Sequence, residues 1–274
     1  MNLIIKIEVS ITIQKMQPEQ ISKRKKSFLR SLHKKKMRYR RNSFLIEGKK
    51  NTLEGLKADW DITRIYFTDE VGKAYLEQIS DNIKKKNINI NKTYPKELEK
   101  VSTLVNPEGI LAVGKIKKQK ELSKFNDEKI LFLDRIRNPG NLGTVLRSAL
   151  WFGLDRVLLS KGSVDPFNPK VVRGSMGSLF YLDFNRNITL SQIQAYSQKQ
   201  NLEILGADMS GTPINKLDEL PSNFILCMGN ESHGLKEEII QEIDRLISIP
   251  KKGKGESLNL AVSSAILMKD LMME

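Results

Sequence analysis

The sequence predicts an α/β protein of two domains, the second of which contains a parallel sheet. Short apolar runs typical of buried strands alternate with longer amphipathic stretches typical of helices along most of the 274 residues. Such alternation, with strongly apolar strands, indicates a mainly parallel sheet covered by helices on both faces. A polar, highly charged stretch at 115–129 separates two such series. We therefore expect an extra segment at 1–15, a smaller first domain at 16–116, a linker at 117–129 and a second domain at 130–274.

The first fifteen residues alternate apolar and polar side chains, as a strand does. Lys6 and Glu8 interrupt the apolar stretch, which is not the pattern of a signal peptide. Met16 follows directly, and the sequence after it reads as a natural beginning. We expect Met16 to be the true initiator, and N-terminal sequencing of the native protein would detect Met1 if this expectation is wrong.

The first domain is expected to alternate helices and strands. Its first helix is rich in cations, and Phe28, Leu29 and Leu32 are its apolar positions. The expected elements are a helix at 22–40, a strand at 43–48, a helix at 51–59, a strand at 62–69, a helix at 73–86, a strand at 87–90 and a strand at 109–116.

The second domain shows the same alternation with more apolar strands. The expected strands are at 130–136, 156–160, 179–184, 203–208, 224–230 and 246–250. The expected helices are at 142–153, 190–200, 235–244 and 258–273. A loop rich in Pro, Gly and Ser is expected at 162–178.

The composition excludes several classes of protein and site. Cys227 is the single cysteine, which excludes an internal disulfide, and two histidines argue against a zinc site or a Ser-His-Asp triad. No apolar run approaches the roughly 18–20 residues that span a bilayer. We expect a protein of the reducing cytoplasm that does not enter a membrane.

The positive charge is concentrated in the first part of the chain. The net charge is +14, and residues 1–120 carry +15 while residues 121–274 carry −1. The densest cations run from Lys23 to Arg41. Spaced cations on a folded surface fit a polyphosphate backbone, so RNA or DNA is the favoured partner over a merely solubilising surface.

Two loops of the second domain follow predicted strands and carry polar side chains. In the first, Asn141 precedes Arg147 by six residues; on spacing alone these are more simply a helix N-cap and an exposed arginine. In the second, Lys170 and Arg173 offer contacts for phosphate, although an ordinary surface loop explains them equally well. Ligands of open parallel sheets bind at the carboxyl ends of strands, where these loops lie.

The third region combines two strand ends. The strand at 224–230 runs into a turn flanked by glycines, and the strand at 246–250 leads through a basic loop to a helix that opens at 257–259. Small residues at two strand ends suit an adenosine-type ligand, because the backbone can approach it closely. Neither G-x-G-x-x-G nor G-x-x-x-x-G-K-[ST] is present, so the usual nucleotide signatures are absent.

Taken in order, these regions resemble a known family. N-L-G-x-x-x-R, then NPKVVRGSMGSLF, then GNESHGL…ISIP…G…SLN resemble the three motifs of the SpoU (TrmH-like) RNA 2′-O-methyltransferases of the SPOUT superfamily, over about residues 130–274. SLHKKKMRYRRNSFLIEG and NPEGILAV resemble the L30e-like substrate-binding domain often fused to them. The resemblance implies a deep C-terminal trefoil knot, a homodimer through the knotted domain, S-adenosylmethionine as methyl donor, and no metal.

The resemblance also assigns site residues by position. It implies that the methyl donor is held by Met228, Gly229, Gly234, Ile249, Pro250, Leu258 and Asn259. The implied catalytic positions are Asn141, Arg147, Glu231, Ser257 and Asn259. The expected RNA contacts are Lys34, Lys35, Lys36, Arg38, Arg40, Arg41, Lys170 and Arg173.

The role of Arg147 follows from its chemistry. An arginine is an awkward general base because its pKa exceeds about 12. A nearby phosphate favours the charged form further. We therefore expect Arg147 to orient the ribose hydroxyl and the adjacent phosphate, with direct proton abstraction as the less favoured alternative. His233 lies near the implied site but is more simply a solvent-facing loop residue.

Three functions remain open on this reading. The first is a ribose 2′-O-methyltransferase, for which Asn141, Arg147 and residues 257–259 are all intact. The second is a non-catalytic RNA-binding or ribosome-assembly protein, and the third is a methyltransferase that acts on a base. Ribosomal RNA is the preferred substrate because of the L30e-like domain, and transfer RNA is the alternative.

Overall fold

The computed structural model describes residues 15–273, so the segment expected at 1–15 lies outside the described residues except for Lys15. The chain divides into two compact units. The first unit extends to Lys117 and also contains Asp165–Phe180, and the second contains Lys118–Val164 and the chain from Tyr181 onward. The first unit therefore includes a stretch that, in sequence, interrupts the second.

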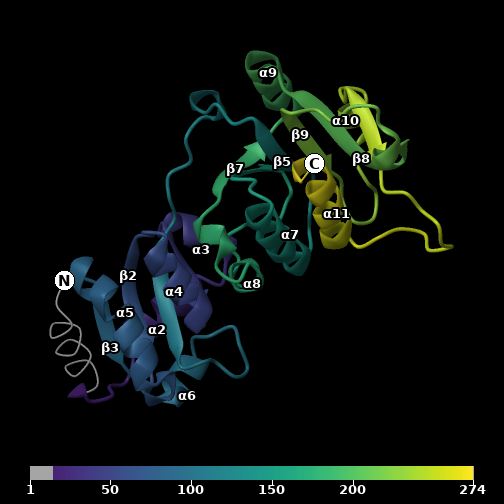
Figure 1. Cartoon of the computed structure of the whole chain (residues 1–274). Coiled ribbons are helices and arrows are strands. Elements are labelled where there is room, and N and C mark those ends of the chain that lie inside the picture. Colours follow the sequence, from purple (N-terminus) through teal and green to yellow (C-terminus); the bar gives the residue numbers. More distant parts are fainter. Residues whose placement is uncertain (1–14, 274) are drawn as a thin grey trace. The chain divides into compact units, whose positions relative to one another are not determined.

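The first unit contains a four-stranded mixed sheet in the order β1, β4, β2, β3, of which β2 and β3 are labelled in Figure 1. β4 is antiparallel to both β1 and β2, and β2 is parallel to β3. The strands are β1 (Ser43–Glu47), β2 (Ile62–Phe67), β3 (Asn89–Lys92) and β4 (Ile110–Lys115). The helices are α2 (Lys23–Ser31), α3 (Lys35–Arg40), α4 (Lys49–Lys57), α5 (Lys73–Lys85), α6 (Pro95–Glu99) and α8 (Pro169–Gly174), with 3-10 turns at Asp69–Val71 and Ser178–Phe180.

β1 is buried on both faces of this sheet, since all five of its residues are buried and successive side chains of a strand point to opposite faces. On one face Leu45 belongs to an apolar cluster with Leu29 and Leu32 of the α2 region. On the other face the ring of Phe44 lies 4.9 Å from that of Phe167 and 6.1 Å from that of Trp60. The stretch that contains Phe167 thus completes the core of the first unit.

A buried ion pair ties the same stretch to α3. The Nε and Nη2 atoms of Arg38 donate to Oδ2 of Asp165 at 2.8 and 2.6 Å, and both side chains are 2% exposed. Tyr39 donates its hydroxyl to the other carboxylate oxygen. The expectation that Arg38 contacts RNA is therefore corrected, because its guanidinium is buried and engaged within the protein.

The single helix expected at 22–40 is two helices in the structure. α2 ends at Ser31 and α3 begins at Lys35. Nη1 of Arg38 donates to the carbonyl oxygens of Leu32 and His33 at 3.0 and 2.9 Å, which satisfies two acceptors that the break leaves open. The break follows from a long-range pairing of Arg38 that helical periodicity does not reveal.

The second unit contains the predicted parallel sheet. Its six strands are all parallel to their neighbours, in the order β10, β8, β9, β5, β6, β7. The strands are β5 (Lys129–Leu133), β6 (Arg156–Ser160), β7 (Asp183–Ile188), β8 (Glu203–Pro213), β9 (Phe224–Met228) and β10 (Arg245–Ser248). The helices are α7 (Pro139–Trp151), α9 (Leu190–Gln200), α10 (Glu237–Ile240) and α11 (Leu260–Met272), with 3-10 turns at Leu122–Lys124 and Ile214–Lys216.

The strand expected at 179–184 is wrong in its position. Residues 178–180 form a 3-10 turn of the first unit, and the strand begins at Asp183. Leu179 and Phe180 are buried, as the residues of a strand would be, but they lie in a turn and not in the sheet. Apolar character alone therefore does not distinguish the two environments.

The central strands of the second unit are fully buried. Cys227 of β9 lies in an apolar cluster with Ile130, Phe132 and Ile225, and burial raises the pKa of its thiol.

Among residues 15–273, no helix is both long enough and apolar enough to cross a membrane.

We predict that Asp165→Asn lowers the free energy of unfolding by about 3–5 kcal/mol, because it leaves the charge of Arg38 buried without a counter-charge. Urea denaturation measures the loss. The matched control is Glu77→Gln, which breaks an exposed pair with Lys73 and should cost at most about 1 kcal/mol. Equal small losses in both variants would show that the Arg38 pair does not hold the unit together.

Candidate functional site

The carboxyl ends of β5 and β9 define the candidate site. These two strands are adjacent and parallel, with Leu133 paired to Met228 at their ends. From β5 the chain proceeds to β6 and β7 on one side, and then crosses to β8 and β9 on the other. The loops after β5 and β9 therefore emerge where the strand order reverses, which is where open parallel sheets bind ligands.

The loop after β9 is a tight turn in which Gly229 has no room for a side chain and Gly234 adopts the left-handed conformation that favours glycine. Asn230 and Gly234 exchange backbone hydrogen bonds, both of 2.9 Å, and Gly234 has a φ of +65°. A Cβ atom on Gly229 would lie 2.1 Å from the carbonyl carbon of Gly234 and 2.2 Å from the amide nitrogen of Leu235. The backbone is therefore packed against backbone, which fixes the residues between the two glycines.

Glu231 stands in this turn and accepts hydrogen bonds from the loop after β5. Its Oε1 accepts from Nδ2 of Asn141 at 3.1 Å and from the backbone N–H of Asn138 at 3.3 Å. Its Oε2 lies 3.3 Å from the donating Nδ2 of Asn230. The carboxylate thus joins the β9 turn to the start of α7.

Asn141 extends the network to a third segment. Its Oδ1 accepts from Nδ2 of Asn259 at 3.1 Å, while its Nδ2 donates to Glu231. The Oδ1 of Asn259 accepts from the backbone N–H of Ala261, which caps α11. The structure therefore brings Asn141 of the first motif together with Glu231 and Asn259 of the third.

The cap of α7 differs from the one expected. Asn138, not Asn141, caps α7, since its Oδ1 accepts from the N–H groups of Gly140 and Asn141 at 2.8 and 3.3 Å. Asn259 caps α11. An Asn followed by Pro139 at the first helical position is itself a sequence signal for a cap, and it identifies Asn138.

Sequence reasoning also missed the support behind the turn. The Nδ2 of Asn230 donates to the carbonyl oxygen of Arg135 at 2.8 Å, and Arg135 has a φ of +52°. The Nε of Arg135 donates to Oδ2 of Asp134 at 2.8 Å, and Asp134 is buried. The ring of His233 lies beside Asn230 at 3.3 Å and is exposed, as expected for a loop histidine. Asp134 and Arg135 follow β5 directly, which is the only signal that marks them.

The residues that the resemblance assigns to the methyl donor lie in the segments around this network. Met228 is buried at the end of β9, and Ile249 is half-buried just after β10. Pro250, Ser257 and Leu258 are exposed in the irregular stretch between β10 and α11, and the side chain of Leu258 is 52% exposed. Leu258 directly precedes Asn259 of the network.

Arg147 is not part of the network. It lies on α7, is exposed, and forms no hydrogen bond or ion pair with any residue of the described chain. Six residues of an α-helix turn it about 120° around the axis from Asn141. Its charge is therefore free to meet a ligand.

The cations of the second motif lie in the first unit. Lys170 is exposed on α8. Nη1 of Arg173 lies 3.8 Å from Oε2 of Glu47 and donates to Oγ1 of Thr103 at 3.4 Å. Arg173 is thus partly neutralised, while Lys170 is not.

Two family models match the chain. The SpoU rRNA Methylase family matches residues 128–269. The MRM3-like substrate binding domain matches residues 23–112. The first range includes the whole hydrogen-bond network of Asn141, Glu231 and Asn259.

Individual proteins are similar over most of the chain. It is 31% identical over 243 residues to the 23S rRNA (guanosine(2553)-2′-O)-methyltransferase RlmP of Bacillus subtilis, covering 88% of this chain and 93% of that protein. It is 31% identical over 165 residues to human mitochondrial rRNA methyltransferase 3, covering 58% of this chain and 38% of that protein. The crystal structure of an AdoMet-bound rRNA methyltransferase from Sinorhizobium meliloti matches with a TM-score of 0.82 and 25% identity, over 93% of this chain and 98% of that one.

We predict that Gly229→Ala lowers the free energy of unfolding by about 1–3 kcal/mol or more, because a methyl group there meets backbone that must move. Thermal or urea unfolding measures the change. Gly253→Ala is the matched control, since a Cβ at Gly253 has open space around it. Unchanged stability of Gly229→Ala would mean that the turn relaxes freely.

Proposed function

The chain belongs to the SpoU rRNA methylase family, and from this and from its site we propose that it transfers a methyl group from S-adenosylmethionine to a ribose 2′-hydroxyl of ribosomal RNA. The observation that supports the proposal most directly is the network in which Asn141 bridges Glu231 and Asn259. It joins polar residues of the first and third motifs at the carboxyl edge of the parallel sheet.

The residues present fit the methyl donor. Gly229 and Gly234 bring bare backbone to the edge of the sheet, where a Cβ at Gly229 would have no room. Ile249 and Leu258 supply apolar side chains that are not fully buried. We assign the adenosine portion to this surface, with main chain from 228–235, 249–251 and 258–260 reading its polar edges. S-adenosylmethionine supplies an electrophilic methyl group on a sulfonium, a reaction that requires no metal.

The side chains around the donor surface have distinct roles in the proposal. Glu231 and Asn259 hold the amide of Asn141 in one orientation, with its nitrogen toward the carboxylate. Arg147, which is exposed and carries a permanent positive charge, orients the ribose and its neighbouring phosphate. Placing the hydroxyl oxygen in line with the methyl group supplies much of the rate. Ser257 is exposed in the stretch between β10 and α11, and it contributes a hydroxyl.

Ribosomal RNA is favoured over transfer RNA as the substrate. The relatives RlmP and human rRNA methyltransferase 3 are both named for ribosomal RNA. The first unit matches the MRM3-like substrate binding domain, whose name refers to rRNA methyltransferase 3. The proposed RNA contacts are those expected cations that the structure leaves accessible. They are Lys34, Lys35, Lys36, Arg40, Arg41, Lys170 and the half-buried Arg173.

The proposal includes a homodimer formed by the second unit. α7 and α11 lie side by side: Asn141 and Asn259 are bonded at their starts, and a Cβ on Gly153 would lie 3.8 Å from Cε of Met272 at their ends. On this pair Trp151 is 82% exposed and Val262 is 47% exposed. A second copy is the occupant that buries them. The trefoil knot and the cytoplasmic location remain predictions from the resemblance and the composition.

The reaction itself is tested with labelled S-adenosylmethionine and total RNA from cells that lack the gene. After nuclease digestion, mass spectrometry should find the label on ribose, and fractionation should place it in ribosomal RNA. Label on a base would overturn the reaction assignment, and label confined to transfer RNA would overturn the substrate. An RNA that is bound but never labelled would favour the non-catalytic alternative.

We predict that Arg147→Ala lowers the single-turnover methylation rate by about 100-fold or more, because it removes a charge that acts on the reacting ribose. Affinity for S-adenosylmethionine, measured by calorimetry, should be unchanged. Thr144→Ala, at an exposed position of the same helix, is the control and should keep full activity. Equal loss of donor binding in Arg147→Ala would assign the residue a structural role instead.

We predict a solution mass near twice the chain mass of 31.3 kDa by light scattering. Trp151→Glu should shift the protein toward the monomer, because a carboxylate cannot be buried there without a partner. A monomeric wild-type protein would contradict the dimer.

A further inference from the structure

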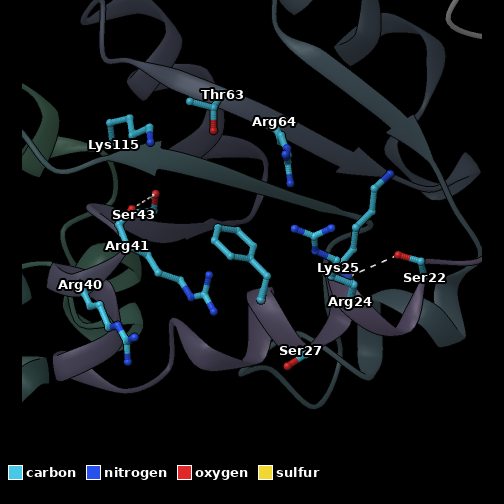
Figure 2. Close-up of a pocket in the computed structure, with 11 residues that line it drawn as sticks. Ser22, Arg24, Lys25, Ser27, Arg40, Arg41, Ser43, Thr63, Arg64 and Lys115 are labelled. Carbon is cyan, nitrogen blue, oxygen red and sulfur yellow. Dashed lines mark hydrogen bonds between the residues drawn. The ribbon is translucent and has the colours of Figure 1, made fainter.

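A basic pocket in the first unit lies outside the residues to which the proposed function assigns a role, except for Arg40 and Arg41 (Figure 2). The pocket has a volume of about 1000 Å³. Six of its lining residues are cationic, and no lining residue is acidic. The cations are Arg24, Lys25, Arg40, Arg41, Arg64 and Lys115.

The fold, rather than the local sequence, gathers these cations. Arg24 and Lys25 lie in the first turn of α2, while Arg40 and Arg41 lie at the end of α3. Arg64 comes from β2, next to the antiparallel strand β4 that ends at Lys115. Figure 2 shows the side chains of Arg24, Arg41 and Arg64 reaching toward one space from these different elements.

The charge of the pocket is not neutralised within the protein. None of the six cations forms an ion pair with an acidic residue of the described chain, and Nζ of Lys25 donates to the neutral Oδ1 of Asn91 at 3.0 Å. Neighbouring α2 cations are different, since Lys26 is paired with Glu97 at 2.6 Å. Six like charges around one concavity repel each other, and a polyanion bound there relieves the repulsion.

An aromatic ring organises two of the guanidinium groups. The half-buried Phe28 lines the pocket, and the guanidinium carbons of Arg41 and Arg64 lie 5.2 and 5.9 Å from its ring centroid. Cation–π contact at these distances holds both groups in place before a ligand arrives. Flat guanidinium groups that are held in this way can stack on an unpaired base while their edges donate to phosphate.

We propose that this pocket binds a single-stranded stretch of the RNA substrate, with the six cations on its phosphates and the Arg41–Phe28–Arg64 group on an unstacked base. The inference rests on the proposed function, because it names the surface that grips the substrate of the same protein. A positive groove with an aromatic platform is the arrangement that single-stranded nucleic acid requires. Duplex RNA exposes phosphates but no free base face, so it uses only part of the pocket. Lys34, Lys35 and Lys36 are exposed but do not line the pocket.

The test measures binding of a fluorescein-labelled dodecamer of uridylate by anisotropy, at several salt concentrations. Arg41→Gln with Arg64→Gln removes two charges from the pocket. Lys84→Gln with Lys85→Gln removes two charges from exposed positions on α5 of the same unit. The pocket variant should bind about tenfold more weakly or worse, and its salt slope should fall by about 1.4, at roughly 0.7 per lost contact to a single strand. The α5 variant should bind within about twofold of wild type, with an unchanged slope.

A second variant separates stacking from charge. Phe28→Leu should weaken binding of the dodecamer and leave the salt slope unchanged, because no phosphate contact is lost. Thermal unfolding checks its folding, since Phe28 also packs on a buried cluster. If Phe28→Leu does not fold, the arginine pair still decides the question.

Three outcomes distinguish this inference from the proposed function. Equal binding by the pocket and α5 variants overturns the inference, even if wild type methylates RNA. Duplex RNA of the same length binding as tightly as the single strand also overturns it. Pocket-dependent binding of the dodecamer, with no methylation of any RNA by wild type, supports the inference and overturns the proposed function.

Discussion

The side-chain amide of Asn141 is the group on which the arrangement of the site depends. An amide both donates and accepts, and here its nitrogen faces Glu231 while its oxygen faces Asn259. One side chain therefore holds the loop after β5, the turn after β9 and the start of α11 in register. A carboxylate in place of the amide would repel Glu231. An apolar residue there would leave Glu231 and Asn259 without this hydrogen-bond partner. The pairing explains why three separate stretches of sequence act as one site.

This network is possible because of two constraints in the backbone. The parallel sheet places the carboxyl ends of β5 and β9 next to each other, so their loops meet without a long detour. The contact of Gly229 with Gly234 then closes the β9 turn tightly enough to aim Glu231 at the start of α7. Arg147 lies outside this rigid group. The candidate site thus combines a fixed hydrogen-bonded framework with an exposed cation.

Much of the fold was predictable from the sequence, because the parallel sheet gives continuous apolar strands between amphipathic helices. The joint site of Asn141, Glu231 and Asn259 was predictable only through the family resemblance, since no spacing shows that residues 90 and 118 positions away from Asn141 touch it. Arg38 shows the limit most clearly. In sequence it is one cation among many, and its burial depends on Asp165, 127 residues away. The basic pocket escaped prediction for the same reason, because Arg24, Arg64 and Lys115 meet only when the sheet forms.

The discontinuous make-up of the first unit has a consequence for the order of events on the ribosome. Its core needs Phe167 beside Phe44 and Asp165 beside Arg38, yet Phe167 and Asp165 belong to a stretch that is made after Lys118–Val164 of the second unit. At roughly 5–20 residues per second, synthesis from Lys117 to Phe180 takes about 3–12 seconds. During that interval Arg38 lacks its counter-charge and Phe44 lacks its aromatic neighbours from this stretch. The amino-terminal unit is therefore translated first but completed only after Phe180 has been made.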